Sequence, residues 1–422
     1  MSRRTAGLIG LTLLALLAGC HRDAAPEEYL FVWAGDSART ASDFLAVLDA
    51  DPASAGYGAV VTSIPTGTAG SMPHHTEAEM PANRHLLANG FAAGTSWLFD
   101  LTNPRAPKIL TSFGDRAGFS HPHTYLRLPN GNVLATFQYL ADSTRPKTPT
   151  SGAGHAGMTM PDEDSTGGLV EMDERGTVIR SASARDTTIA DRKIYPYAVV
   201  AVPSLDRAIS TTTDMNPADS APMHWVQFWR LSDLSLLHSI RLPAGPLGTE
   251  QKFTGEIRVL PDGKSVYVHT FGCGLYLIRN LDSSAPTAQL AYTFPGENCG
   301  VPILAGHYWL QPVPKLHALV ALDVSDPAHP REVSRVVVGK DDEEPHWIAI
   351  DRTGTRIVLN SAGSGSGDRL FVIDLDPATG ALSLDQRFRD PGASDPGVSM
   401  RGKPWPHGFS GTAVPHGTVF SR

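Results

Sequence analysis

Residues 97–113, WLFDLTNPRAPKILTSF, and residues 319–336, LVALDVSDPAHPREVSRV, are two versions of one pattern. Each begins with an apolar run that ends in aspartate, continues with a turn that contains Asn-Pro or Asp-Pro, and closes with a second run rich in apolar residues. Short apolar runs on either side of turn residues are typical of two antiparallel strands. The pattern therefore predicts a repeated strand–turn–strand unit.

Five weaker copies of this unit occur elsewhere in the chain, at residues 44–61, 169–181, 226–242, 275–292 and 370–386. The seven turns are spaced by about 43 to 71 residues, and a propeller blade with insertions repeats at roughly this period, about 40 to 50 residues or more. Hairpin-like segments lie between the units at residues 123–137, 197–212, 255–271 and 346–361. They supply the inner two strands of four-stranded blades, whose outer strands are the repeated units.

The predicted fold is therefore all-β, a seven-bladed β-propeller that occupies residues 29–422. Residues 29–35, YLFVWAG, lead directly into the first outer unit and leave the first blade without its innermost strand. The C-terminal segment VPHGTVFS, residues 414–421, is the natural donor of that strand. We expect the N- and C-terminal strands to close the ring together.

The first 28 residues are not expected to belong to the fold. Arg3 and Arg4 precede an apolar run that is too short to span a bilayer and that ends in Leu17-Ala18-Gly19-Cys20. This pattern predicts a bacterial lipoprotein signal peptide at residues 1–19, a lipidated Cys20 and a short tether over residues 20–28. An ordinary secretory peptide is the alternative. The predicted location is the periplasmic side of the cell envelope, with the lipid anchored in the outer membrane.

The formal net charge is −8, and the chain has no basic run. Both features argue against nucleic acid as a partner. If Cys20 is lipidated, only Cys273 and Cys299 remain. An oxidising compartment permits a disulfide between them, although the sequence leaves their pairing open.

Histidines recur at one position of the inner hairpins. His75, His123 and His346 each lie six residues before the hairpin turn, at Pro81, Pro129 and Arg352. The same position is occupied by Tyr197 and Gly255 in two further blades, and His416 begins the proposed closing strand. This position is the start of the innermost strand, which faces the propeller axis at one rim. The imidazoles are therefore expected to converge there.

Neutral imidazoles bind zinc, copper, iron and nickel. Because structural zinc sites usually include thiolates, an all-histidine set favours copper or iron. His74 is an alternative to His75, since adjacent residues on a strand point to opposite sides. Tyr197 and Trp347 are expected to line a substrate pocket, and Glu77 and Glu344 are candidates for orienting the imidazoles. The acidic run 341–344 makes a calcium site possible but less favoured than a solvated loop. The alternative to a metal site is that these histidines only form hydrogen bonds with water.

Several of these residues also carry a family resemblance. The stretches YLFVWAGD (29–36), DFLAVLDADP (43–52) and YGAVV (57–61), together with His74-His75 and Pro122-His123-Thr124, resemble the selenium-binding protein/methanethiol oxidase family. Pro415-His416-Gly417 resembles the closing motif of that family more loosely. The resemblance is good over residues 29–137 and patchy beyond.

Members of the family are β-propellers, and its bacterial members are periplasmic copper enzymes. These enzymes convert methanethiol, oxygen and water to formaldehyde, hydrogen sulfide and hydrogen peroxide. The resemblance implies metal ligation by His74, His75, His123 and His416. Three departures mark a divergent member, and the first is the lipoprotein anchor, which is unusual in the family. The cysteine-bearing segment that follows the double histidine is absent from residues 76–90, so selenium binding is not expected, and Gly417 replaces an acidic residue.

The predicted function is a copper-dependent oxidase of a small, methanethiol-like thiol, with oxygen as its second substrate and a membrane contact through the lipid anchor alone. Two alternatives stay open. One is a non-enzymatic, membrane-tethered propeller that binds metal or a protein partner. The other is a metal-dependent lactonase that would use oxygen ligands such as Glu256 or Asp214, which the shared histidine position disfavours.

Overall fold

The computed structural model describes residues 28–141, 166–190, 193–215, 223–339, 343–361 and 368–421. The predicted signal peptide, Cys20 and the tether up to residue 27 lie outside the described residues, as do Asp341 and Asp342 of the acidic run. Within the described ranges, no helix is long and apolar enough to cross a membrane.

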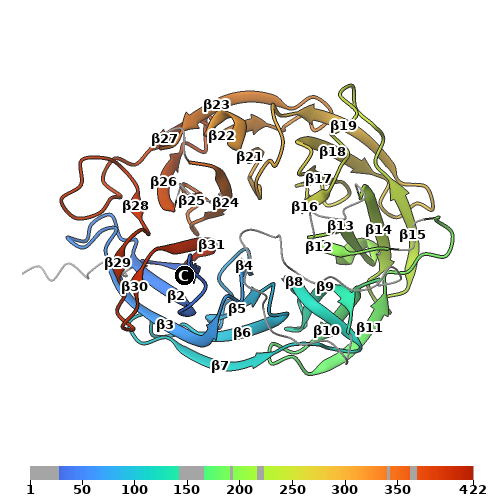
Figure 1. Cartoon of the computed structure of the whole chain (residues 1–422). Coiled ribbons are helices and arrows are strands. Elements are labelled where there is room, and N and C mark those ends of the chain that lie inside the picture. Colours follow the sequence, from blue (N-terminus) through green and yellow to red (C-terminus); the bar gives the residue numbers. More distant parts are fainter. Residues whose placement is uncertain are drawn as a thin grey trace, which may run out of the picture.

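Seven β-sheets radiate from a central axis, and each sheet is one blade (Figure 1). Blade 1 contains, from the axis outward, β31 (Ala413–Phe420), β1 (Tyr29–Asp36), β2 (Ser42–Asp49) and β3 (Val60–Ala69). Blade 2 contains β4 (Pro73–Thr76), β5 (His85–Gly90), β6 (Thr95–Asp100) and β7 (Lys108–Phe113). Blade 3 contains β8 (Phe119–Arg127), β9 (Val133–Leu140), β10 (Gly168–Met172) and β11 (Val178–Ser183).

The other four blades follow the same antiparallel order. Blade 4 contains β12 (Pro196–Val202), β13 (Arg207–Thr212), β14 (Trp225–Arg230) and β15 (Leu236–Arg241), and blade 5 contains β16 (Thr254–Val259), β17 (Val266–Thr270), β18 (Gly274–Arg279) and β19 (Thr287–Thr293). Blade 6 contains β20 (Ile303–Ala305), β21 (Tyr308–Val313), β22 (Ala318–Asp323) and β23 (Arg331–Val337). Blade 7 contains β24 (Pro345–Ile350), β25 (Arg356–Ser361), β26 (Arg369–Leu375) and β27 (Leu382–Leu384). The predicted seven-bladed β-propeller is confirmed.

Three short strands and two 3-10 turns complete the described elements. β28 (Val398–Ser399) pairs with β26, and β29 (Lys403–Pro404) pairs with β30 (Ser410–Gly411) in a separate hairpin. The turn η1 (Pro203–Leu205) joins β12 to β13 in blade 4, and η2 (Pro314–Leu316) joins β21 to β22 in blade 6.

Ring closure joins the two ends of the described chain. β31 runs antiparallel to β1, with Leu30 opposite Phe420 and Gly35 opposite Val414. The last strand in sequence is thus the innermost strand of the first blade, as predicted. This pairing removes the open edge that blade 1 would otherwise present at the axis.

The core lies between neighbouring blades. Every residue of β1 is buried, because the strand sits in the middle of a sheet that is covered on both faces, whereas β11 at the outer edge alternates between exposed and half-buried residues. Between blades 1 and 2, the ring of Trp33 packs 5.5 Å from that of Trp97 and 5.7 Å from that of Phe99. Burial on two faces explains why the inner strands read as almost continuous apolar runs.

The disulfide that the sequence left open is present. Cys273 and Cys299 are bonded, with their Cα atoms 5.2 Å apart. Both cysteines are fully buried between blades 5 and 6, within a cluster that includes Tyr267 and Trp309. The bond therefore ties two neighbouring blades together.

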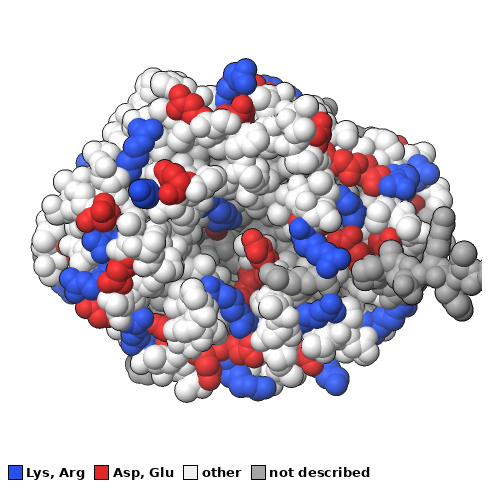
Figure 2. All heavy atoms as spheres, turned by 180° about the vertical axis from the view of Figure 1, so that it is seen from behind, with Lys and Arg blue, Asp and Glu red and all other residues white. Residues whose placement is uncertain are grey.

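The surface seen from behind carries no single sign of charge. Figure 2 shows acidic and basic side chains interspersed over this face and around its hollowed centre. Such mixing keeps the summed potential of the face low.

Candidate metal centre at the propeller axis

The innermost strands of all blades except blade 6 have an irregularity of register near their first residues, in most cases a β-bulge. In blade 2, Pro73 pairs with Gly90 and Thr76 pairs with Ala88, so that His74 and His75 together oppose Asn89. The same two-against-one arrangement recurs where β8, β12 and β16 pair with the second strands of their blades. A bulge of this kind bends the strand and re-aims its side chains. The bulges therefore decide which side chains meet at the axis.

A proline precedes the first bulge residue in most blades. The pairs are Pro73-His74, Pro122-His123, Pro196-Tyr197, Pro345-His346 and Pro415-His416. By this criterion His74, rather than His75, occupies the position of the other histidines. The count of six residues to the turn selects His75 because the connection after β4 is one residue longer than the others.

Both members of the double histidine reach the cluster. The rings of His74 and His75 are stacked, with centroids 4.3 Å apart and planes 22° apart. Strand alternation would have placed them on opposite sides, but the bulge breaks that alternation. The expectation that only one of the two could face the axis is therefore wrong.

All five predicted histidines lie together. The Nε2 atoms of His74 and His123 are 3.0 Å apart, and those of His346 and His416 are 3.1 Å apart. The two pairs are joined because the rings of His74 and His416 are 4.2 Å apart. One nitrogen from each of His74, His75 and His123 can be chosen so that all three lie within 4.8 Å of one another.

The two aromatic residues predicted to line a pocket also touch these histidines. The ring of Tyr197 lies 3.9 Å from that of His123, and its hydroxyl is 3.4 Å from Nε2 of His75. The indole of Trp347 lies 4.9 Å from His75, and its Nε1–H donates to the carbonyl of Thr418. Aromatic rings thus flank the imidazoles on two sides.

Burial differs across the cluster. His74, His75 and His123 are at most 4% exposed, whereas His346 and His416 are half-buried. Desolvation lowers the pKa of His123 to about 3, and desolvation and then the neighbouring imidazoles hold the pKa of His75 well below its ordinary value. Both rings are therefore neutral at physiological pH, which is the form that binds metal.

The tautomer of His123 follows from its neighbours. Its Nδ1 lies 2.9 Å from the carbonyl oxygen of Tyr197, which can only accept a hydrogen bond. Nδ1 must therefore carry the proton, and the lone pair of the neutral ring is on Nε2, the atom that faces His74. Metal-binding histidines are commonly oriented in this way by a carbonyl or carboxylate on the other nitrogen.

Buried side chains opposite the bulges hold them in place. Asn89 accepts from the backbone N–H of His75 at 2.6 Å and donates to the carbonyl of His123 at 3.1 Å. Asn360 accepts from the N–H of Trp347 at 3.0 Å and donates to the carbonyl of His416. Each asparagine thus ties the bulge of its own blade to the bulge of the next blade around the ring.

The carboxylate near the cluster is not one of the two that the sequence singled out for orienting the imidazoles. Glu77 is bound by Arg127 at 2.7 Å and accepts from the N–H of Leu87 at 2.8 Å, and Glu344 is exposed. Instead, Oε1 of Glu256 lies 4.0 Å from Nδ1 of His75, while Arg258 holds its other oxygen at 2.6 Å. Glu256 directly follows the shared position in blade 5, a signal that could have identified it.

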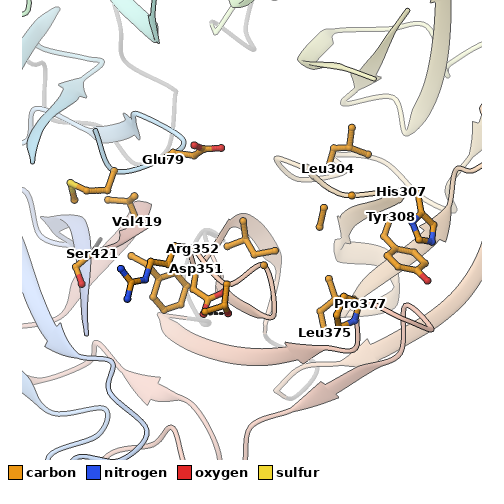
Figure 3. Close-up of a pocket in the computed structure, with 17 residues that line it drawn as sticks. Glu79, Leu304, His307, Tyr308, Asp351, Arg352, Leu375, Pro377, Val419 and Ser421 are labelled. Atoms are coloured by element: carbon orange, nitrogen blue, oxygen red, sulfur yellow. Dashed lines mark hydrogen bonds between the residues drawn. The ribbon is translucent and has the colours of Figure 1, made fainter. Parts of the chain in front are cut away.

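A cavity of about 580 Å³ lies at the other end of the inner strands. It is lined by the last residues of β24 and β31, including Ile350 and Val419, and by Glu79, Arg352 and Tyr308 (Figure 3). His346 and His416 lie toward the first residues of these two strands. None of the five histidines lines the cavity. We therefore assign the chemistry to the histidine cluster and not to the cavity.

The donor set fits a transition-metal ion. Five imidazoles supply borderline nitrogen ligands, and no thiolate is among them. Nitrogen pairs about 3 Å apart are what two ligands of one ion show when each bond is about 2.0 to 2.1 Å. Imidazole alone does not select among copper, iron and zinc.

Comparison with known proteins gives a partial match in sequence and a full match in fold. No family model matches the chain. A methanethiol oxidase of Hyphomicrobium sp. is 36% identical over 117 residues, or 26% of this chain and 25% of the relative. The match therefore spans only a quarter of that relative.

Two solved structures illustrate the fold. A hypothetical selenium-binding protein from Sulfolobus tokodaii has a TM-score of 0.71 at 16% identity, over 94% of both chains. The periplasmic gluconolactonase of Pseudomonas aeruginosa has a TM-score of 0.60 at 14% identity, over 94% of this chain and 99% of its own. At such identities the likeness establishes the propeller alone. The sequence match over a quarter of the relative supports the selenium-binding protein/methanethiol oxidase family only loosely.

Proposed function

We propose that this chain is a metal-dependent, thiol oxidase-like enzyme that acts on a small, methanethiol-like thiol. The observation that carries the proposal is the five-histidine cluster, in which the lone pair of His123 is held toward His74. The partial sequence match to a methanethiol oxidase supports the substrate class. The proposed reaction is CH₃SH + O₂ + H₂O → HCHO + H₂S + H₂O₂, in which the methyl carbon is oxidised and oxygen is reduced to peroxide.

Copper is the metal that we propose, held by His74, His75, His123, His346 and His416. When bound, it would supply one-electron redox chemistry and lower the pKa of a coordinated thiol. The protein's part is to keep His75 and His123 neutral by burial and to fix the orientation of His123 through the carbonyl of Tyr197. The half-buried edge at His346 and His416 provides the side from which a small molecule reaches the cluster.

Tyr197 and Trp347 would define the space beside the cluster. Both are nearly inaccessible, with exposures of 1% and 3%. Their rings present apolar faces to a methyl group, and packing against them would exclude water from the reacting atoms. Such a space suits a small thiol better than a sugar lactone.

A hydrolytic role is less well supported. Glu256 is held in an ion pair by Arg258, and Asp214 accepts from the hydroxyl of Tyr139 at 3.2 Å. Among the described residues, the metal-compatible group consists of three histidines and contains no carboxylate. The non-enzymatic alternative, a tethered metal-binding propeller, predicts bound metal without thiol-dependent oxygen consumption.

The proposed location is the periplasmic side of a bacterial cell envelope, with a lipid anchor on Cys20. The support is the sequence Leu17-Ala18-Gly19-Cys20 after an apolar run. Mass spectrometry of the protein purified from membranes would test it, because diacylglycerol on Cys20 gives a defined mass increase.

The decisive experiment measures the metal content and electron paramagnetic resonance spectrum of the chain purified without chelator, together with oxygen uptake on addition of methanethiol. We expect about one copper per chain with nitrogen hyperfine structure, and thiol-dependent oxygen uptake. His123→Ala should lose metal and turnover together. His329→Ala is the matched control, since that imidazole is exposed and pairs only with Asp326 nearby.

Two outcomes would contradict the proposal. Turnover that survives in His123→Ala would remove the cluster from the mechanism. Copper bound without any thiol-dependent oxygen uptake would favour the non-enzymatic alternative.

A further inference from the structure

One blade lacks a side chain at the shared axial position. The first bulge residue is histidine in four blades and tyrosine in blade 4, but in blade 5 it is Gly255. Directly opposite this bulge, on β17, is His269. The same position of the second strand is held by asparagine in blades 2 and 7 and by threonine in blades 3 and 4. His269 is therefore an imidazole at a position where those four blades have a side chain that hydrogen-bonds to the backbone of the bulge.

The ring of His269 fills the place where a side chain at position 255 would begin. A Cβ added to Gly255 would lie 2.7 Å from Nδ1 of His269 and 3.2 Å from the ring of Phe271. In the other blades this Cβ leads a histidine or tyrosine toward the axis. Nδ1 of His269 therefore points toward Gly255 on the innermost strand and packs closely against it.

This nitrogen is a buried acceptor without a partner. His269 is 0% exposed, and its Nδ1 makes no hydrogen bond. Its Nε2 lies 2.9 Å from the carbonyl of Cys299, so Nε2 carries the proton and Nδ1 carries the lone pair. Burial lowers the pKa of His269 to about 3, which keeps the ring neutral. An unpaired buried acceptor destabilises a protein unless a ligand supplies a donor.

The surroundings connect this acceptor to the histidine cluster. Phe271 lies 5.3 Å from the ring of His269 and 5.5 Å from that of Tyr197, which contacts His75 and His123. Beside Gly255 is Glu256, 4.0 Å from His75. The acceptor therefore lies beside Gly255 and close to the cluster, and the neighbouring ring of Phe271 is an apolar surface that suits a methyl group.

We propose that His269 is a substrate-positioning residue that accepts a hydrogen bond from the S–H of a small thiol bound beside Gly255. The inference rests on the proposed function and adds the residue that orients the substrate. The thiol proton stays on sulfur in this contact. The hydrogen bond turns the sulfur lone pairs toward the imidazole cluster and places the methyl group against Phe271.

Two variants test the assignment by different routes. His269→Asn introduces asparagine, which is the residue opposite the bulges of blades 2 and 7. We therefore expect the fold to tolerate it. Gly255→Ala keeps the imidazole but puts a methyl group 2.7 Å from its Nδ1. His329→Asn, on the exposed outer surface, is the matched control.

The readouts are metal content, KM and kcat for methanethiol, and the inhibition constant of dimethyl sulfide, which has no S–H. We expect both variants to retain metal and to raise KM about 3- to 10-fold, the loss of one hydrogen bond, with little change in kcat. The inhibition constant of dimethyl sulfide should be unchanged in His269→Asn, because a thioether cannot donate to His269.

The failures are distinguishable. A wild-type protein that binds no metal or consumes no oxygen overturns the proposed function and this assignment with it. An active wild type with an unchanged KM in both variants overturns the role of His269 alone. A KM increase accompanied by an equal change for dimethyl sulfide would show that the variants distort the pocket, which also counts against the hydrogen bond.

Discussion

At the scale of single residues, backbone geometry at the axis depends on side-chain amides. Asn89 is fully buried and makes three hydrogen bonds, one from the N–H of His75 at 2.6 Å and two to the carbonyls of Pro122 at 2.7 Å and His123 at 3.1 Å. It therefore fixes the backbone of two candidate ligands from neighbouring blades. A side chain that acts through ligands in this way tunes metal affinity without touching the metal.

Asn89→Ala should weaken both stability and metal binding. The substitution leaves buried backbone groups unpaired, which costs about 1 to 3 kcal/mol, and we expect a 10- to 100-fold loss of copper affinity. Denaturant unfolding and competitive metal titration measure the two effects. Asn89→Thr, the residue type that accepts and donates at the same place in blades 3 and 4, should recover much of the loss. Equal affinity in Asn89→Ala and wild type would show that the histidines hold their positions without the amide.

The sequence could place these histidines at the axis but not their mutual geometry. Turn spacing locates His75, His123 and His346 by counting, and the need for a strand that closes the ring locates His416. The bulge at His74 and His75 depends on the pairing of β4 with β5, which no local pattern encodes. Glu256 was named only as an oxygen ligand of a lactonase, and His269 was missed, because their relation to the axis exists only through the bulge of β16 and the absence of a side chain at Gly255.

At the scale of elements, the segment after Cys299 supports one of the candidate ligands. The N–H of Val301 donates to the carbonyl of His346 at 2.6 Å. Gly300 packs so closely on the His346 backbone that a Cβ there would collide with it. The disulfide between Cys273 and Cys299 holds the start of this segment on blade 5. The segment after Cys299 therefore connects the disulfide to the backbone of His346.

Replacing both cysteines by serine should reveal this link. Because the cysteines are 26 positions apart in the sequence, removal of the crosslink is expected to cost roughly 3 kcal/mol of stability through the unfolded state. Looser support of His346 should also reduce copper affinity, whereas His123 on the other side of the cluster stays in place. Unfolding curves and metal titrations of the double variant and the wild type measure both. A loss of stability with unchanged affinity would mean that the segment keeps its place through hydrogen bonds alone.

Element prediction from the sequence succeeded where strands are long. The outer pairs and four inner hairpins read as apolar runs around Gly, Pro, Asn or Asp turns. The inner strands of blades 2 and 6 were not recognised as hairpins, because β4 has only four residues and β20 only three. Strands of that length are too short to show an alternating pattern, and tertiary pairing determines them.

At the scale of the whole molecule, the histidine cluster spans the closure of the ring. Its members come from blades 7, 1, 2 and 3, and therefore from both ends of the described chain. His416 lies on β31, which completes blade 1, while His74 and His123 come from the first third of the sequence. A metal ion bound by these residues would crosslink the closing strand to its neighbours on both sides, in addition to the hydrogen bonds between β31 and β1.

Metal should accordingly raise the thermal stability of the whole propeller. A ligand that binds only the folded chain stabilises it by about 2.7 kcal/mol when its free concentration is 100 times Kd, which corresponds to an increase in Tm of a few degrees. Differential scanning calorimetry of copper-loaded and chelated protein measures this shift. In His416→Ala the shift should shrink strongly, although the backbone pairing of β31 with β1 remains. In His329→Ala it should match the wild type. A full shift in His416→Ala would mean that the ion is held by blades 2 and 3 alone, and that ring closure and metal binding are independent.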